Sequence, residues 1–418
     1  EDYVMHPIIG MEHPYYYRNK AQFPVGLGKD GQIVTGFYAG HSHVIVDSAH
    51  CCIQAPVNEQ LLAIVKRWMT EHDIAPYDET THKGLVRHIL TRVGFKTKET
   101  MVCLIINGKK LPHSESLVEA LREIPGMTSI SFNINQDKTT EIKEENGVPY
   151  IVFKNLELPG IVHGFSTRLG GVSEGIYSTM NLSFHRGDDM DAVMENHRRL
   201  AQAVGYDYRR LVFSDQVHET VIRKITEEDA GKGITRESDI TETDGLMTNV
   251  KDLPLITFYA DCVPVFFYDP VKEVVAMNHS GWRGTVKNIS LHMVEALNKE
   301  YGCEASDLIC AVGPSICQNC YEVSEDVAEA FQDAYLPEQY DKMTKKIGNG
   351  KYLLDLHRAN YYNLTGAGIL PDHINVTDIC TCCNPDFLFS HRASHGKRGN
   401  LGAVIMLKST ADGGNVNE

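Results

Sequence analysis

Hydrophobic positions in the first third of the chain follow two different periods. Short runs rich in β-branched and aromatic residues, separated by glycine and Asp-Gly turns, predict strands over Ala21–Val25, Gln32–Tyr38, His43–Val46, Gly84–Gly94, Thr100–Ile106 and Ser129–Ile134. Helical spacing of apolar residues predicts a helix over Gln60–Thr70, with Asn58 as its N-cap, and a shorter helix over Leu117–Arg122. We therefore expect a small α+β unit within residues 1–136.

A second unit is expected over residues 148–418, after a polar stretch at 137–147 that predicts a linker. The same periodicities predict helices over Asp191–Val204, Lys287–Glu300 and Ser324–Ala334, and strands over Tyr150–Phe153, Leu255–Ala260, Val263–Tyr268, Val274–Asn278 and Ala403–Leu407. Several strands cluster between helices without strict alternation. This order favours an α+β fold built on mixed sheets with flanking helices over a doubly wound fold.

Composition and charge limit the classes of partner. The 418 residues are too many for one ordinary core, and no apolar run approaches the ~18 residues of a membrane span. The net charge of −15 divides into −2 for residues 1–137 and −13 for the rest, which makes electrostatic capture of nucleic acid unexpected. Eleven cysteines without a secretory signal predict free thiols or metal ligands in a reducing, cytoplasmic environment.

Two motifs suggest chemistry that their context does not favour. Gly26-Leu-Gly28-Lys-Asp-Gly31 has the spacing of a dinucleotide fingerprint, but a β-prone run follows it where a helix is required, so we predict a hairpin turn. Cys317-Gln-Asn-Cys320 and Cys380-Thr-Cys382-Cys383 could form a zinc ribbon. Their separation of about sixty residues exceeds the usual ~15–20, so buried structural thiols are the favoured interpretation.

Three residues near predicted strand ends could bind one metal ion. Cys262 interrupts an apolar run, His279 lies at the end of the next, and His218 closes the strand-like sequence Asp215-Gln-Val-His218. Thiolate and imidazole ligands suit zinc, and three protein ligands leave a fourth position open. Two other interpretations stay open, because Cys262 could be a nucleophile with a histidine base or an inert buried thiol.

Motifs in a characteristic order run through residues 148–410. They are Gly164-Phe-Ser-Thr-Arg168, Asn181-Leu-Ser-Phe-His185, Asp215-Gln-Val-His218, Thr243-Asp-Gly245, Ala260-Asp-Cys262, His279-Ser-Gly-Trp-Arg-Gly284, Gly313-Pro-Ser-Ile316, Cys320-Tyr-Glu-Val323 and Phe389-Ser-His-Arg392. With these motifs the second unit resembles the YfiH/YlmD laccase-domain family, also described as multicopper polyphenol oxidases or purine nucleoside phosphorylases. The resemblance implies a YfiH-like mixed-sheet sandwich.

The resemblance also implies roles for individual residues. It implies zinc ligands at His218, Cys262 and His279, and further polar positions of the same cleft at Arg168, Asn181, His185, Asp244, Arg283 and Arg392. Cys262, His185 and Asp244 are the expected catalytic residues, the last two in proton or hydrogen-bond roles. Arg168, Asn181, Arg283 and Arg392 are the expected substrate-binding residues, with arginine forks suited to phosphate. The family commonly has Asn-Arg-Arg where this chain has Asn196-His197-Arg198, so a phosphate site there would be weaker or pH-dependent.

The activity implied is zinc-dependent phosphorolysis of adenosine, inosine or guanosine, with phosphate as co-substrate. Cleavage of methylthioadenosine and deamination of adenosine by metal-activated water are further implied activities. A copper-dependent polyphenol oxidase is the alternative. It is disfavoured because the single His-x-His pair, His41-Ser-His43, lies in the other unit and several such pairs are needed for a trinuclear centre.

The first unit resembles a different family. His13-Pro-Tyr-Tyr-Tyr-Arg-Asn-Lys-Ala-Gln22, Gly36-Phe-Tyr38, Cys52-Ile-Gln54 and Gly84-Leu-Val-Arg-His-Ile89 resemble parts of the RNA uracil-5-methyltransferases. No S-adenosylmethionine-binding domain follows, and Cys52 matches one ligand of an iron–sulfur cluster that needs four. We expect an incomplete methyltransferase-like fragment. A second alternative is an RNA-associated, metal-binding adaptor with a basic face around Arg18, Lys20, Arg87 and Arg92.

Overall fold

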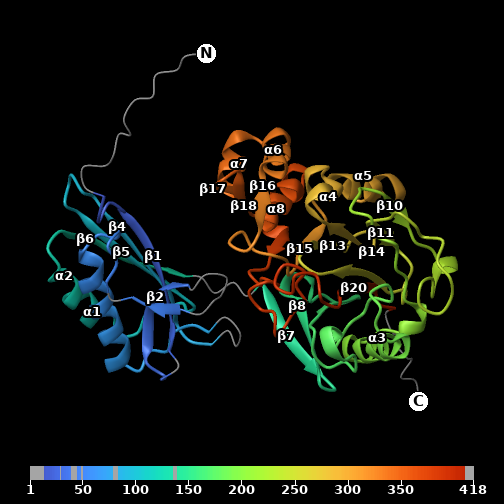
Figure 1. The fold of residues 1–418 in the computed structure, drawn as a ribbon, viewed down its shortest axis with the longest axis horizontal. Coiled ribbons are helices and arrows are strands. Elements are labelled where there is room, and N and C mark those ends of the chain that lie inside the picture. The colour runs from blue at the N-terminus through green and yellow to red at the C-terminus, as the bar shows by residue number, and fades with distance from the viewer. Residues whose placement is uncertain are drawn as a thin grey trace, which may run out of the picture. The chain divides into compact units, whose positions relative to one another are not determined.

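The structure, a computed structural model, describes residues 14–28, 30–38, 45–48, 50–78, 83–134 and 139–409. Contacts divide the chain into two compact units, Glu1–Lys138 and Thr139–Glu418 (Figure 1). His41 and His43 lie outside the described residues. Among the helices of the described part, none is long and apolar enough to cross a membrane.

The first unit is a six-stranded sheet with two helices. Its elements are β1 Lys20–Leu27, β2 Ile33–Tyr38, β3 Ile45–Asp47, α1 Val57–Glu71, β4 Val86–Val93, β5 Thr100–Ile106, α2 Ser114–Arg122 and β6 Met127–Ile134. The strand order is β3-β2-β1-β4-β5-β6, and only β5 and β6 are parallel. Both helices bury their apolar faces against this sheet around Phe23, Leu61 and Leu104. The predicted hairpin is confirmed, because Leu27 of β1 pairs with Ile33 of β2.

The basic residues of the first unit do not all lie free on its surface. Lys20 and Arg92 face each other across β1 and β4, and both are exposed. The Arg87 guanidinium instead stacks over the ring of Tyr77, 4.2 Å from its centre. Binding of RNA at this face stays a prediction.

The second unit contains two stacked sheets and a small third one. The five-stranded sheet has the order β12-β20-β9-β8-β7, from strands β7 Thr140–Glu145, β8 Val148–Phe153, β9 Ile161–Ser166, β12 Leu255–Tyr259 and β20 Leu401–Leu407. The six-stranded sheet has the order β10-β11-β14-β13-β15-β19, from β10 Ile222–Lys224, β11 Gly245–Thr248, β13 Val263–Asp269, β14 Val274–Ser280, β15 Ile309–Val312 and β19 Ile374–Val376. The small sheet contains β16 Glu322–Ser324, β17 Thr344–Gly348 and β18 Lys351–Leu354.

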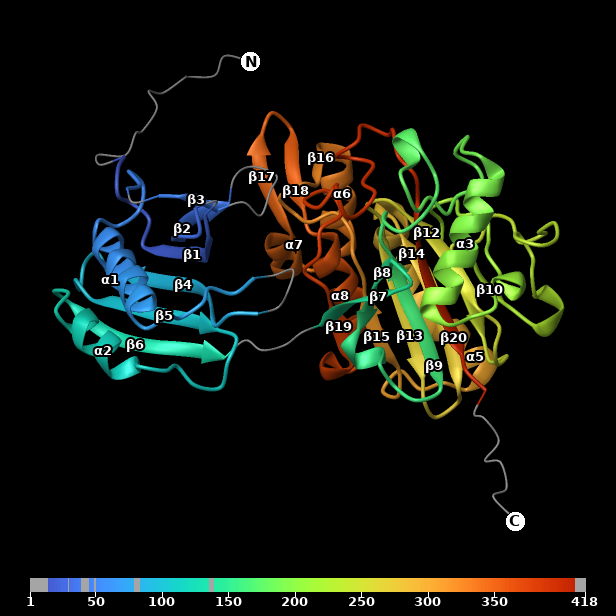
Figure 2. The same cartoon turned by 90° about the horizontal axis from the view of Figure 1, so that it is seen from below.

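Helices cover both outer faces of this sandwich (Figures 1 and 2). The helices of this unit are α3 Met190–Val204, α4 Trp282–Val286, α5 Ile289–Tyr301, α6 Glu325–Ala334, α7 Pro337–Met343 and α8 Leu356–Gly366, of which α6 and α7 lie beside the small sheet. Leu200 of α3 packs outside the five-stranded sheet, and Met293 and Leu297 of α5 pack outside the six-stranded one. Strand β13 is buried along its whole length, because Phe267 faces the helices and Phe266 faces the other sheet. The predicted mixed-sheet α+β fold is confirmed.

The predicted linker over 137–147 is wrong from Thr139 onward. Residues Thr140–Glu145 form the edge strand β7, which pairs antiparallel with β8. Only Ile142 in the middle of this strand contributes to the sandwich core, and the charged residues around it occupy the outside of the sheet. Polar edge strands are common because charge on an edge prevents pairing with other chains, which makes them resemble linkers in sequence.

Candidate active site

His218, Cys262 and His279 come together from three segments of the second unit. Their ligand atoms all lie within 4.8 Å of one another, and Cys262 Sγ is 3.8 Å from His218 Nε2. Cys262 lies in the short connection between β12 and β13, and His279 lies in the neighbouring strand β14, opposite Pro264. The sulfur and the two imidazole nitrogens could therefore hold one metal ion.

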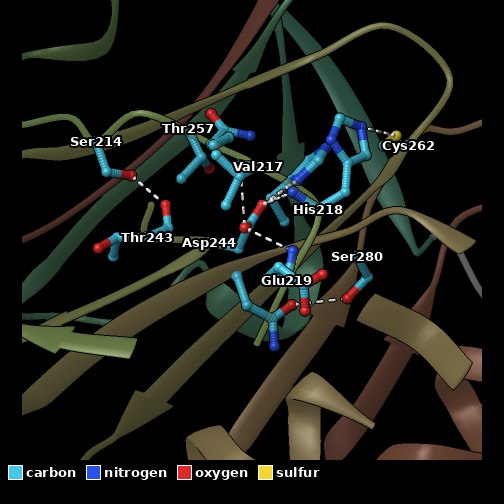
Figure 3. A network of polar contacts seen from close by, with 12 residues as sticks. Ser214, Val217, His218, Glu219, Thr243, Asp244, Thr257, Cys262 and Ser280 are labelled. Carbon is cyan, nitrogen blue, oxygen red and sulfur yellow. Dashed lines mark hydrogen bonds and ion pairs between the residues drawn. The ribbon is translucent and has the colours of Figure 1, made fainter. Parts of the chain in front are cut away.

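His218 reaches the site from an irregular segment, so the strand predicted over Asp215–His218 is wrong. Its backbone has a φ of +66°, a left-handed conformation that strands do not use. The segment is held instead by the carboxylate of Asp244, which accepts hydrogen bonds from the backbone N–H groups of Val217, His218 and Glu219 at 2.8–3.1 Å (Figure 3).

Asp244 also orients a metal-ligand candidate. Its Oδ1 lies 2.8 Å from Nδ1 of His279, so Nε2 of that ring is the nitrogen left for a metal. The Asp244 side chain is fully buried and does not line the cavity described below. Asp244 therefore positions His279 and the His218 segment, and its expected role as a proton donor or acceptor for the substrate stays a prediction.

The electrostatics of the three residues favour a thiolate. Burial raises the pKa of Cys262, but the adjacent His279 and the hydrogen bond from His218 outweigh burial and lower the pKa to about 6. Burial lowers the pKa of His279, whereas the thiolate of Cys262 and the carboxylate of Asp244 raise it to about 9. A preformed thiolate is the form of cysteine that binds metals.

The three residues open into a cavity of about 1050 Å³ with an aromatic wall and several arginines. The wall includes Phe184, Phe213 and Phe258, with the Phe213 and Phe258 rings 5.2 Å apart at 76°. The arginines that line the cavity are Arg186, Arg236, Arg283, Arg392 and Arg398. Flat apolar surfaces suit an aromatic base, and guanidinium groups suit a phosphate.

Besides the three metal-ligand candidates, three more of the expected site residues line this cavity. His185 and Arg283 are exposed in it, and the Arg283 guanidinium stacks over the Trp282 ring at 4.4 Å. Arg392 also lines the cavity, although its guanidinium donates to the backbone carbonyls of Cys320 and Glu322 at 3.0 and 2.9 Å. Arg392 therefore forms part of the cavity wall and also contributes a positive charge to the cavity.

Two expected substrate-binding residues lie outside the cavity lining. Arg168 donates to the carbonyls of Ser178 and Pro385 at 2.9 and 2.6 Å, so its guanidinium joins two loops. Asn181 is fully buried, and its amide oxygen accepts from the backbone N–H groups of Ser183 and Asn400. In this structure both side chains bond to backbone groups, and the substrate contacts predicted for Arg168 and Asn181 stay predictions.

His197 is also removed from the cavity. It is fully buried in α3, its Nε2 bonds to the Leu182 carbonyl at 2.8 Å, and its ring stacks on Phe184 at 5.2 Å. Burial lowers the pKa of His197 to about 4. The imidazole therefore supports the aromatic wall as a neutral group and does not contact a phosphate in the cavity.

Arg398 is a cavity residue that could not be selected from the sequence. It is 8% exposed, and its Nε is buried without a hydrogen-bond partner among the described residues. Burial lowers the pKa of Arg398 to about 10, and nearby Arg186 acts in the same direction. A buried guanidinium with an unused donor is a candidate for binding an anion. Its position two residues beyond Gly396 in a polar turn carried no signal of this burial.

Comparison with known proteins agrees with this geometry. A family model described as "Multi-copper polyphenol oxidoreductase laccase" matches residues 162–408. The chain belongs to this family. The protein named "Purine nucleoside phosphorylase YlmD" of Bacillus subtilis (strain 168) is 36% identical over 249 residues, which is 59% of this chain and 89% of that relative. The crystal structure of YlmD from Geobacillus stearothermophilus superposes with a TM-score of 0.61 and 33% identity, covering 65% of this chain and all of that one.

A different relative matches the first unit. An uncharacterized RNA methyltransferase of Caldanaerobacter subterraneus subsp. tengcongensis is 46% identical over 140 residues, which is 33% of this chain and 30% of that relative. The expected resemblance of both units is thus confirmed. The enzyme names of the family relatives support an enzymatic role for the second unit, and the His218, Cys262 and His279 cluster supports a bound metal.

Proposed function

We propose that this protein is a zinc-dependent purine nucleoside phosphorylase acting on adenosine, inosine or guanosine. The observation that supports the proposal most is the opening of the His218, Cys262 and His279 cluster into a cavity that combines aromatic walls with arginines. One soft thiolate and two imidazoles suit zinc, and their number leaves a position open. The family relatives named as purine nucleoside phosphorylases supply the reaction class.

The reaction exchanges one bond at the ribose for another. An oxygen of phosphate forms a bond to C1′ of the ribose, and the bond from C1′ to the purine nitrogen breaks. The nitrogen keeps the bonding electrons and takes up a proton, so the products are ribose 1-phosphate and the free base. A metal bound in the cluster would supply a Lewis acid in the cavity.

The residues of the chain would divide the remaining tasks. Arg398 and Arg283 would hold phosphate by charge-assisted hydrogen bonds, since both guanidinium groups line the cavity. The faces of Phe184 and Phe258 would receive the purine. His185 is the candidate donor of the proton to the departing base, because it is exposed in the cavity.

Product analysis tests the proposal directly. The purified protein is incubated with adenosine, inosine, guanosine or methylthioadenosine, with and without phosphate, and free base and sugar phosphate are quantified. We expect base release only with phosphate, together with an equal amount of sugar 1-phosphate. Base release that does not need phosphate would contradict phosphorolysis, and conversion of adenosine to inosine would show that deamination occurs.

A copper-dependent phenol oxidase is the alternative suggested by the family description. The described residues offer two candidate metal clusters, His218–Cys262–His279 and a group of four cysteines, and neither provides the several His-x-His pairs of a trinuclear copper centre. Oxidation of a phenol by a preparation that contains zinc and no copper would contradict our assignment of the metal's role.

For the first unit we propose an accessory role without methyl transfer.

A further inference from the structure

Four cysteines outside the cavity converge from two loops of the second unit. The sulfur atoms of Cys317, Cys320, Cys380 and Cys383 all lie within 4.8 Å of one another. Cys383 Sγ is 3.9 Å from Cys317 Sγ and 3.4 Å from Cys320 Sγ. A tetrahedral zinc site with Zn–S bonds of 2.3 Å has sulfur–sulfur edges of about 3.8 Å, whereas a disulfide bond is about 2.05 Å long. All four residues are free thiols, at the spacing of a metal site.

The topology of the six-stranded sheet explains how these loops meet. Strands β15 and β19 are parallel neighbours, so the loops that follow them leave the sheet at the same edge. A further parallel bridge between Ser315 and Cys380 continues the pairing into the loops. The 59 residues between Cys320 and Cys380 fold as β16 to β19 and return the chain to its starting point. The long separation of Cys320 and Cys380 along the chain is therefore compatible with one shared metal site.

Backbone groups already point at one sulfur as they do around metal-bound thiolates. The N–H groups of Cys317 and Cys383 both donate to Cys380 Sγ, at 3.2 and 3.3 Å. The N–H groups of Cys320 and Tyr321 close a tight turn on the Cys317 carbonyl. Hydrogen bonds to sulfur stabilise its negative charge and orient it, which is the task of the outer shell of a metal site.

Because the site is largely buried, its four cysteines can be thiolates together only beside a cation. Cys320 and Cys380 are buried, and Cys317 and Cys383 are half-buried. Thiolates gathered in such surroundings repel one another and lose hydration unless a positive ion compensates them. Four soft sulfur ligands without an open position are the donor set of structural zinc.

We propose that Cys317, Cys320, Cys380 and Cys383 bind a structural Zn²⁺ ion, distinct from the metal of the cavity. The interpretation as metal-free structural thiols is replaced by this proposal. Cys382 does not belong to the cluster, although it is adjacent to Cys383 in sequence.

The zinc would hold one wall of the cavity in place. Thr381, between two of the ligands, donates to Asp261 at 2.6 Å, directly beside Cys262. The second Asp261 oxygen accepts from the backbone N–H of Arg392 at 2.7 Å, and the Arg392 guanidinium bonds to the Cys320 carbonyl. Joining the two loops thereby fixes Arg392 and the turn that presents Cys262.

Metal analysis of variants tests this proposal apart from the proposed activity. We expect about two zinc ions per chain in the protein purified under reducing conditions, about one in Cys262→Ala, and about one in Cys317→Ser. Cys382→Ser is the matched control and should keep both ions. In the cobalt-substituted protein, thiolate-to-cobalt absorption should remain strong in Cys262→Ala and fall sharply in Cys317→Ser.

Several results would overturn the proposal. One is complete loss of zinc in Cys262→Ala. Another is the presence of iron in place of zinc in the wild-type protein. A third is an intact mass that shows a disulfide among the four residues. If the cavity binds no metal but the four cysteines do, the result is different: the wild-type protein contains one zinc ion, and Cys262→Ala keeps it. If Cys317→Ser does not fold, a mercurial thiol reagent titrated into Cys262→Ala should release one zinc ion to a coloured chelator, and no release would contradict the proposal.

Discussion

At the scale of single residues, the metal cluster of the cavity depends on neighbours that do not bind metal. Gly281 leaves room for His218, and Asp244 fixes both the ring of His279 and the backbone around His218. Arg398 contributes a buried charge that faces the same cavity. Each of these residues can be changed without removing a proposed metal ligand, so each gives a separate prediction.

Gly281→Ala should lose most of the metal of the cavity. A Cβ at this position would lie 2.7 Å from His218 Cδ2 and 3.4 Å from Cys262 Sγ, so the imidazole must move. Metal content and melting temperature are the measurements. Gly366→Ala is the control, since a Cβ there meets no atom within 4 Å; equal metal content in both variants would contradict the prediction.

Asp244→Asn should weaken metal binding by about 10–100-fold, because the amide cannot support the His279 ring as a carboxylate does. The lost acceptor capacity for buried backbone N–H groups should also cost about 1–3 kcal/mol of stability. Competition with a chelator measures the affinity. Glu242→Gln, which changes an exposed carboxylate of the same loop, should leave the affinity unchanged.

Arg398→Gln should raise the KM for phosphate by about 10–100-fold, which corresponds to losing a hydrogen bond to a charged group. The KM for the nucleoside should change much less. Arg168→Gln serves as a comparison: it should lower the melting temperature, because Arg168 joins two loops, and leave the KM for phosphate unchanged. The opposite pattern would restore the role that the sequence motif suggested for Arg168.

At the scale of elements, the helices and strands predicted from the sequence mostly lie within a few residues of observed ones, because their spacing of apolar residues matches burial on one or both faces. Several short elements of the second unit, among them β9, α4 and α8, were not predicted. The helix over Gln60–Thr70 begins at Val57, so the predicted N-cap Asn58 lies inside its first turn. The larger errors concern polar segments. Strand β7 and the His218 segment are stabilised by pairing with β8 and by Asp244, which local sequence does not reveal.

Helix α3 and strand β9 should make stability depend on pH. Burial lowers the pKa values of His197 and His163 to about 4, so the folded protein resists protonation while the unfolded chain accepts protons below about 6.5. Their contribution is full above pH 6.5 and is lost as pH falls toward 4, by roughly 3 kcal/mol for each residue.

Melting temperatures measured between pH 7 and pH 4 test this dependence. His197→Gln should start from a lower melting temperature and lose less of it on acidification than the wild-type protein. His395→Gln removes an exposed histidine and should keep the wild-type slope. Identical slopes for wild type and His197→Gln would contradict the assignment.

At the scale of the whole molecule, the two units have separate hydrophobic cores. The core around Phe23 and Leu61 belongs to the first unit alone, and both the metal cluster and the cavity are built from residues of the second. The difference in charge between the two parts accords with their resemblance to two different families.

A chain that begins at Thr139 should therefore fold and keep the metal content and nucleoside phosphorolysis of the full chain. Metal analysis and the product assay, run side by side on both chains, are the measurements. Loss of activity with unchanged metal content would show that the first unit contributes to catalysis.

The family, the mixed-sheet fold class and the cluster of His218, Cys262 and His279 could be predicted from the sequence, because they depend on the spacing of apolar residues and on motifs of fixed residue types. The partners of each polar side chain depend on tertiary contacts, which local sequence does not specify. Arg168, Asn181 and Asp244 are bound to backbone groups, whereas Arg398 faces the cavity, and residue type alone does not distinguish these environments. The four cysteines also lie together because of tertiary contacts: the parallel pairing of β15 and β19 places side by side two loops that are far apart along the chain.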